Sequence, residues 1–183
     1  MALVVEDGTG KVDAESYVSV VDAGAYAASH GLTFNVTGDP AIALAEKALR
    51  RATTWLDGQY RSQFLGYRRF GRSQRLEWPR SGAYVQAVPY GTIAQDEVPH
   101  EVVEATVEAA VRELAVPGAL SPDVTPGRIQ KSVRVEGAVA VEYSIGTGGA
   151  YDQRPVLTVV SGILAPVLGN DSSGGLFGKA SRS

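Results

Sequence analysis

The sequence predicts a mainly α-helical protein with a small helical bundle, a β-hairpin and an extended C-terminal arm. Three observations lead to this fold class. Two long segments repeat apolar residues at spacings of three and four, the period changes to two after residue 128, and an apolar stretch near the C-terminus follows a glycine-rich one. A chain of 183 residues is too short for two ordinary domains. We therefore expect a helical body with the hairpin at 1–145, and a flexible link, short helix and tail at 146–183.

A first, short helix is expected from about Val20 to His30. Ser19 and Asp22 form a capping box, because the serine hydroxyl can accept a hydrogen bond from the first turn while the aspartate favours the positive end of the helix. Gly31 fits the left-handed position that ends many helices.

A second helix is expected to begin at Asp39 as the cap, with Pro40 at the first helical position, and to end near Gly58. On its polar side, Glu46 and Arg50 have the spacing of an ion pair within one helix. Its apolar face would consist of Ile42, Ala45, Leu49, Ala52 and Leu56.

A third helix is expected to open at 96–99 and to end at Pro117 and Gly118. Its apolar stripe would be Val103, Val107, Ala110, Val111 and Leu114. We expect an ordinary solvated face made of Glu101, Glu104, Glu108 and Glu113.

Between the second and third helices, from Tyr60 to Tyr90, the periodicity fails and we expect a long loop. The region from Arg50 to Arg80 has a net charge of +6, against −9 for the rest of the chain. Arginines neutralise phosphates and aromatic rings stack on bases, so a mixture of the two is typical of non-specific nucleic-acid surfaces. The candidate contacts with DNA or an acidic partner are Arg61, Arg68, Arg69, Arg72, Arg75 and Arg80.

The same residues allow a plainer interpretation of this loop. Tyr60, Phe64 and Trp78 would then be core residues that anchor a solvated basic loop, because a basic loop alone does not identify its anion. Both interpretations remain open at this stage.

Alternating residues from Ile129 to Ser144, with a turn at Gly137 and Ala138, predict a β-hairpin. An isolated hairpin is only marginally stable in water, so we expect this one to pack on the helices or on another subunit.

Three features are expected after the hairpin. Residues 146–154 have the composition of a flexible link. The apolar stretch at 156–168 predicts a short helix that Pro166 bends or ends. From Gly169 onward the composition is that of a tail that is disordered when alone in solution.

Composition disfavours several classes of chemistry. The chain has no cysteine, which removes disulfides, thiol nucleophiles and cysteine-ligated zinc. His30 and His100 are its two histidines, and no spacing places a nucleophile or carboxylate cluster beside them, so a hydrolase is disfavoured. The glycines at 146–149 lack a Walker lysine and are interpreted as a linker. We expect no catalytic residue, no metal site and no cofactor.

The chain also lacks the usual signals for secretion or membrane insertion. Glu6 and Asp7 lie where a signal peptide would be basic. The longest apolar run, at 156–168, is shorter than the roughly 20 residues that span a bilayer. We expect neither a signal peptide nor a membrane partner.

Several segments, taken together and in order, resemble the head-tail connector (adaptor, or head-completion) proteins of long-tailed phages and gene transfer agents. Similar sequences are often labelled DnaT-like single-stranded-DNA-binding proteins. The resemblance covers nearly the whole chain, and each segment is weak alone. The segments are the opening at 8–20, the helix end at 47–60, the Leu-Glu-Trp-Pro-Arg-Ser-Gly sequence at 76–82, the helix at 98–115, the hairpin at 131–143 and the terminal stretch at 162–169.

The resemblance implies a structural protein of the virion neck, assembled in the host cytoplasm. It would form a homo-oligomeric, dodecameric ring beneath the portal protein, extend the channel for double-stranded DNA, and provide the platform for the stopper or tail-terminator protein. The family has no catalytic residue to carry over.

The resemblance also suggests that the portal binds the apolar C-terminal segment. The candidate docking residues are Val156, Leu157, Val160, Ile163, Leu164, Val167 and Leu168. The alternative function is a non-specific single-stranded-DNA-binding protein in phage replication, with the arginine and aromatic loop as the groove for the strand.

Overall fold

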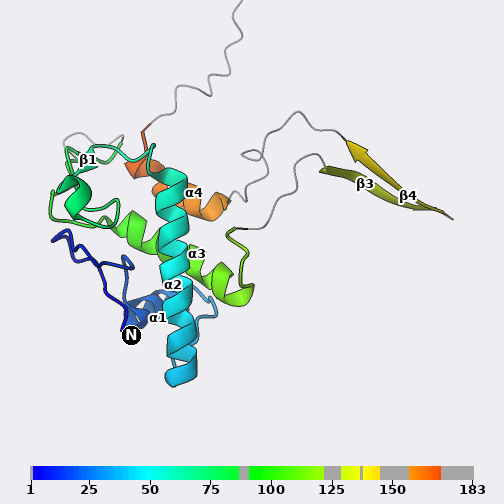
Figure 1. Cartoon of the computed structure of the whole chain (residues 1–183), viewed down its shortest axis with the longest axis horizontal. Coiled ribbons are helices and arrows are strands. Elements are labelled where there is room, and N and C mark those ends of the chain that lie inside the picture. The colour runs from blue at the N-terminus through cyan, green and yellow to red at the C-terminus, as the bar shows by residue number, and fades with distance from the viewer. Residues whose placement is uncertain (1, 87–90, 122–128, 137, 145–156, 170–183) are drawn as a thin grey trace, which may run out of the picture.

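The computed structural model describes residues 2–86, 91–121, 129–136, 138–144 and 157–169 (Figure 1). These residues form a mainly α-helical fold with a β-hairpin, as the sequence predicts. The helices are α1 (Val20–Ser29), α2 (Asp39–Tyr60), α3 (His100–Ala115) and α4 (Thr158–Leu164), with short 3₁₀ turns η1 (Gly71–Ser73) and η2 (Ala165–Val167). The strands are β1 (Tyr67–Arg68), β2 (Arg80–Ser81), β3 (Ile129–Glu136) and β4 (Ala138–Ser144).

Helix α1 has the expected capping box. The Ser19 hydroxyl accepts from the backbone N–H of Asp22 at 3.1 Å and donates to the Asp22 carboxylate at 2.6 Å. The helix ends at Ser29, and Gly31 has the positive φ of 67° that suits a glycine after a helix.

Helix α2 is the long central helix of the body (Figure 1). Its N-cap is Gly38, and no side chain caps it, so the expected capping role of Asp39 is wrong. The Glu46–Arg50 ion pair forms at 3.2 Å. Four residues of the predicted apolar face are buried, namely Ala45, Leu49, Ala52 and Leu56. The fifth, Ile42, is 36% exposed, because the first turns of α2 extend beyond the other helices (Figure 1).

Helix α3 packs against α2, but its buried face differs from the predicted stripe. Val103, Val111 and Leu114 are only partly buried, and Glu101 and Glu113, predicted on the solvated face, are buried. The buried face consists of Glu101, Val102, Ala105, Thr106, Val107, Ala109, Ala110 and Glu113.

Glu113 is buried because each of its carboxylate oxygens has partners. They accept hydrogen bonds from the backbone N–H of Gly118 at 2.8 Å and of Leu120 at 3.3 Å, and Arg51 lies 2.9 Å away. A buried carboxylate is tolerated when it is paired and hydrogen-bonded. Glu113 thus ties the turn after α3 to α2.

Helix α4 confirms the predicted C-terminal helix and packs against α3. Around it, the Ser161 and Tyr60 hydroxyls lie 2.8 Å apart, and the Gly169 N–H donates to the Gln63 carbonyl at 2.6 Å. Residues 157–169 therefore share one core with α2 and α3.

Strands β3 and β4 form the predicted antiparallel hairpin, with Val133 opposite Val141 and a register shift between Gln130 and Ser132. Figure 1 shows the hairpin apart from the four helices. The expected link at 146–154 and the expected tail from 170 onward lie outside the described residues.

The expected structureless loop after α2 has an ordered framework. β1 pairs with β2 in antiparallel fashion, and the side chain of Gln74, 1% exposed, lies at the centre of the loop. Its amide oxygen accepts from the Phe70 N–H at 2.9 Å, and its amide nitrogen donates to the carbonyls of Leu76 at 2.9 Å and Pro79 at 3.1 Å.

Aromatic packing anchors this loop to the body. Trp78 is fully buried and meets the Phe64 ring edge-on, with ring centroids 5.7 Å apart. Tyr60 and Phe64 are each 5% exposed. The plainer interpretation of these three aromatic residues as core anchors is therefore correct. No helix among the described residues combines the length and apolar character needed to cross a membrane.

Candidate nucleic-acid interface

The segment before the second short strand is locked to α2 by two buried polar side chains. The Tyr17 hydroxyl donates to Asp57 at 2.6 Å and accepts from the backbone N–H groups of Glu77 at 3.0 Å and Trp78 at 3.2 Å. The second oxygen of Asp57 accepts from the same Glu77 N–H at 3.1 Å. These bonds fix the position of the segment that leads into β2.

Burial governs the electrostatics of this pair. It raises the pKa of Asp57 to about 7, against the hydrogen bonds from Tyr17 and Glu77, which lower it. Burial, followed by the nearby charge of Asp57, holds the pKa of Tyr17 well above its usual value. Tyr17 therefore remains a hydroxyl donor.

Arg80, predicted as a surface contact, is 6% exposed and has a structural role. Its guanidinium donates to the carbonyls of Leu65 at 2.8 Å, Phe64 at 3.3 Å and Gly66 at 2.7 Å. It also pairs with the Glu77 carboxylate at 3.0 Å. Burial lowers the pKa of Arg80. Because its donors are engaged inside the protein, the prediction that Arg80 contacts DNA or an acidic partner is wrong.

Arg61 and Arg69 are both in contact with the body. The Arg61 Nε donates to the Asp57 carbonyl at 3.3 Å and lies 3.9 Å from the Glu77 carboxylate, while its side chain is 64% exposed. Arg69 donates to the Gln95 carbonyl at 3.2 Å, and its guanidinium carbon lies 4.9 Å from the centre of the Phe70 ring. Both keep donors available to a ligand.

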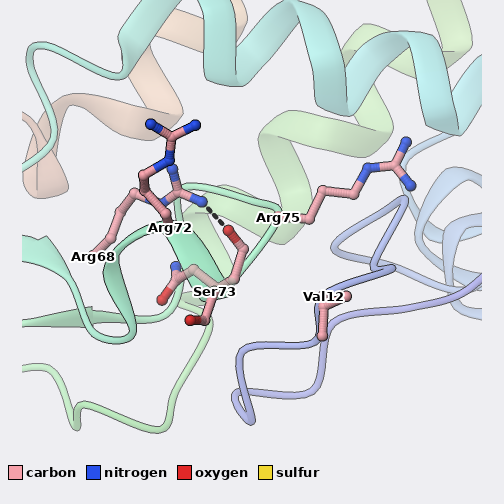
Figure 2. Close-up of a pocket in the computed structure, with 6 residues that line it drawn as sticks. Val12, Arg68, Arg72, Ser73 and Arg75 are labelled. Carbon is pink, nitrogen blue, oxygen red and sulfur yellow. Dashed lines mark hydrogen bonds between the residues drawn. The ribbon is translucent and has the colours of Figure 1, made fainter.

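Arg68, Arg72 and Arg75 line one surface hollow of about 640 Å³ (Figure 2). Figure 2 shows the guanidinium of Arg75 extending away from those of Arg68 and Arg72. Val12, Ser73 and Gln74 complete the lining, so the described lining carries no acidic side chain. Three of the six predicted arginines thus line one hollow, with Arg75 pointing away from the other two.

The N-terminal turn contributes Val12 to the lining of the hollow. The Glu6 side chain fixes the backbone of this turn. Glu6 is 3% exposed, and its carboxylate accepts from the N–H groups of Gly8 at 2.9 Å, Gly10 at 2.8 Å and Lys11 at 2.8 Å. Sequence reasoning missed this role, although the glycines at 8 and 10 are a local signal for a tight turn. The Arg75 N–H then donates to the Lys11 carbonyl at 3.2 Å and joins this turn to the basic loop.

Three described aromatic side chains of the same loop are exposed, namely Tyr67, Phe70 and, at 48%, Tyr84. Tyr67 is 67% exposed and Phe70 is 42% exposed. One side of Phe70 lies against Gly10, where a Cβ atom would be only 2.2 Å from the ring. The exposed rings and arginines together give the loop the chemistry that suits a nucleic-acid strand.

Neither of the two histidines lines the hollow. His30 stacks on Tyr26, with ring centroids 3.9 Å apart, and the His100 side chain is 76% exposed. Within the described ranges, no group of three or more histidine, aspartate or glutamate side chains is arranged to hold a metal ion.

The residues predicted to dock on the portal are mostly internal. Ile163 and Leu168 are partly buried, and Val156 lies outside the described residues. Those buried in the chain's own core are Leu157, Val160, Leu164 and Val167. This face is therefore occupied by the body of the same chain.

Comparison with known proteins gives one family. Neither the curated proteins nor the solved structures contain a match to this chain. One family model, described as "Putative DnaT-like ssDNA binding protein", matches residues 1–183. The chain belongs to this DnaT-like family.

Proposed function

We propose that the protein is a head-tail connector, which forms a ring beneath the portal of a tailed phage or gene transfer agent. The ring would extend the channel for double-stranded DNA and provide the platform for the stopper or tail. The proposal rests on the resemblance of ordered segments along nearly the whole chain.

The observation that carries the proposal is the β3–β4 hairpin. It pairs with no third strand among the described residues, so each strand has one edge without a described partner strand. Two-stranded hairpins are marginal in water, and open strand edges pair readily with another chain. In a ring, every copy offers the same two surfaces to its neighbours, so one hairpin per copy can close a set of head-to-tail contacts.

The charge distribution supports a protein that surrounds DNA. The region from Arg50 to Arg80 carries a net charge of +6 within a chain of net charge −3. Positive side chains on one part of a ring subunit can face phosphates without reading the sequence of bases. This suits a channel through which a whole genome passes.

The portal contact in this proposal does not use the buried face of α4. Leu164 and Val167 are fully buried, so their use would require α4 to leave the core. Deleting 146–183 would remove this part of the core together with any portal contact. Point variants are therefore a sharper test than truncation.

The test is co-expression of the full chain with a cognate portal protein, followed by negative-stain electron microscopy. The wild-type chain should be monomeric or a weak oligomer alone, and should form rings on the portal. Val141→Pro removes a backbone donor from β4 and should prevent ring formation while the helical circular dichroism is retained.

Val141→Thr is the matched control, because threonine is β-branched and keeps the backbone N–H. Its rings should form normally. A stable closed ring without portal, or normal decoration of portals by Val141→Pro, would contradict the proposed mechanism.

A second candidate function is non-specific binding of single-stranded DNA in phage replication. The family description favours it, as do the exposed rings of Tyr67 and Phe70 beside Arg68 and Arg69. This function predicts tight and strongly salt-dependent binding of single strands by the isolated chain, with a clear preference over duplex DNA. The connector function predicts no such preference.

A further inference from the structure

The hollow in Figure 2 is lined by three arginines and, among the described residues, by no acidic side chain. Arg50, Arg51 and Arg80 each pair with a carboxylate within 3.2 Å. Arg72 and Arg75 are exposed, and within the described ranges neither lies within 4.0 Å of a carboxylate oxygen. Arg75 does act electrostatically on Glu15, whose pKa is lowered mainly by its hydrogen bond from Arg50. The loop thus keeps two exposed cationic groups on the lining of this hollow, extending in different directions.

Arg68 adds a donor that is buried and has no acceptor. Its Nε atom is inaccessible to solvent and has no hydrogen-bond partner among the described residues, although its Nη2 donates to the Gln74 carbonyl. A buried donor without an acceptor is uncommon in folded proteins and calls for an explanation. Because Nε is closed to solvent, a ligand oxygen in the hollow would reach it only if the Arg68 side chain moved.

The walls of the hollow are fixed before any ligand binds. Gln74 joins three backbone groups of the loop, and the Arg75 N–H is bonded to the Lys11 carbonyl. Such a framework limits the entropy lost on binding to the side chains of the arginines. A volume of about 640 Å³ is within the range of small-ligand sites.

We propose that this hollow binds the phosphate backbone of DNA, with Arg68 and Arg72 at one phosphate and Arg75 at a neighbouring one. This deepens the proposed function, because it assigns the DNA contact of each copy to one place. The planar guanidinium group can form paired hydrogen bonds with the oxygens of either a phosphate or a carboxylate. The exposed rings of Tyr67 and Phe70 in the same loop favour nucleic acid over an acidic protein, because they offer stacking surfaces for bases.

The test uses the full chain and fluorescent 20-nucleotide DNA, both single-stranded and duplex, followed by anisotropy at several salt concentrations. The variant is Arg72→Ala with Arg75→Ala, and the matched control is Lys47→Ala with Arg112→Ala, which removes the same charge at other exposed positions. The hollow variant should bind at least about tenfold more weakly than the control at about 100 mM salt.

The salt dependence reports the number of phosphates contacted. The slope of log affinity against log salt should be shallower in the hollow variant by about 1.4 for single strands or about 1.8 for duplex, and unchanged in the control. Equal losses in the two variants, or no DNA binding by the wild-type chain at about 20 mM salt, would overturn the proposal. So would poly-glutamate that displaces DNA from the wild-type chain as effectively as unlabelled DNA, because the site would then be one for carboxylates.

This outcome is separate from that of the connector proposal. If the hollow variant loses DNA affinity but still decorates portals, both proposals stand. If neither the wild type nor the control decorates portals but the hollow variant still shows its selective loss of DNA affinity, the connector function fails and the phosphate site stands.

Discussion

The hydroxyl of Tyr17 lies 2.6 Å from a carboxylate oxygen of Asp57 and joins the N-terminal segment to α2 across 40 positions of sequence. The same hydroxyl oxygen accepts hydrogen bonds from the backbone N–H groups of Glu77 and Trp78. One side chain therefore holds three segments together, and the basic loop depends on this contact for its position.

The first prediction concerns the pH dependence of stability. The pKa of Asp57 is about 7 in the folded chain and close to 3.8 when unfolded, so the folded protein binds this proton more tightly. The contribution of Asp57 to the free energy of unfolding is thus fully present below about pH 4 and is lost as the pH rises through 7. Asp57→Asn does not titrate and should abolish this contribution.

Urea denaturation of both proteins between pH 4 and 8 provides the measurement. The difference in unfolding free energy, wild type minus Asp57→Asn, should fall by an amount on the order of a few kcal/mol across this range. A constant offset is also expected, because asparagine has one acceptor fewer. A difference that does not change with pH would refute the assignment.

The second prediction separates structural from exposed arginines. Arg80→Ala leaves Glu77 with only its 3.9 Å contact to Arg61 and removes donors from three loop carbonyls. Breaking a buried ion pair in this way costs about 3–5 kcal/mol. Chemical denaturation should show this loss, whereas Arg72→Ala should change stability by less than about 0.5 kcal/mol. Similar values for the two variants would show that Arg80 is not structural.

The third prediction concerns Glu113. Glu113→Ala leaves the N–H groups of Gly118 and Leu120 without their acceptor and Arg51 without its partner. The expected loss is about 1–3 kcal/mol in the free energy of unfolding. Glu97→Ala is the matched control, because Glu97 is exposed. If Glu113→Ala is as stable as this control, the turn after α3 does not depend on the carboxylate.

The fourth prediction tests whether α4 belongs to the core. Leu164 is fully buried, so Leu164→Ala should cost about 2–5 kcal/mol through lost burial and the cavity that remains. Val159, on the same helix, is 46% exposed, and Val159→Ala should have little effect. Thermal unfolding checks both. An equally small effect at the two positions would mean that α4 is attached only loosely.

Much of the helical framework could be predicted because its signals are local. The Ser19 capping box and the face of α2 that contains Leu49 follow from residues no more than four positions apart. The hairpin followed from a change of period. The face of α3 was misjudged because periodicity counts glutamate as polar, while Glu113 is buried by partners that lie outside the helix.

The basic loop was the least predictable part. Its order comes from contacts distant in sequence, such as Tyr17 with Trp78 and Lys11 with Arg75, and no local pattern encodes them. The arginines were recognised as a group, but sequence alone could not separate Arg80, whose donors bind carbonyls inside the protein, from Arg72, which stays exposed.

The connection between α3 and β3 sets the distance over which the hairpin can act. Ser121 is described in the body, and β3 begins eight residues later at Ile129. Even a fully extended chain covers roughly 29 Å over eight residues. The start of β3 therefore remains inside a sphere of that radius centred on Ser121. Any surface that captures the start of the hairpin must therefore come within this distance of Ser121.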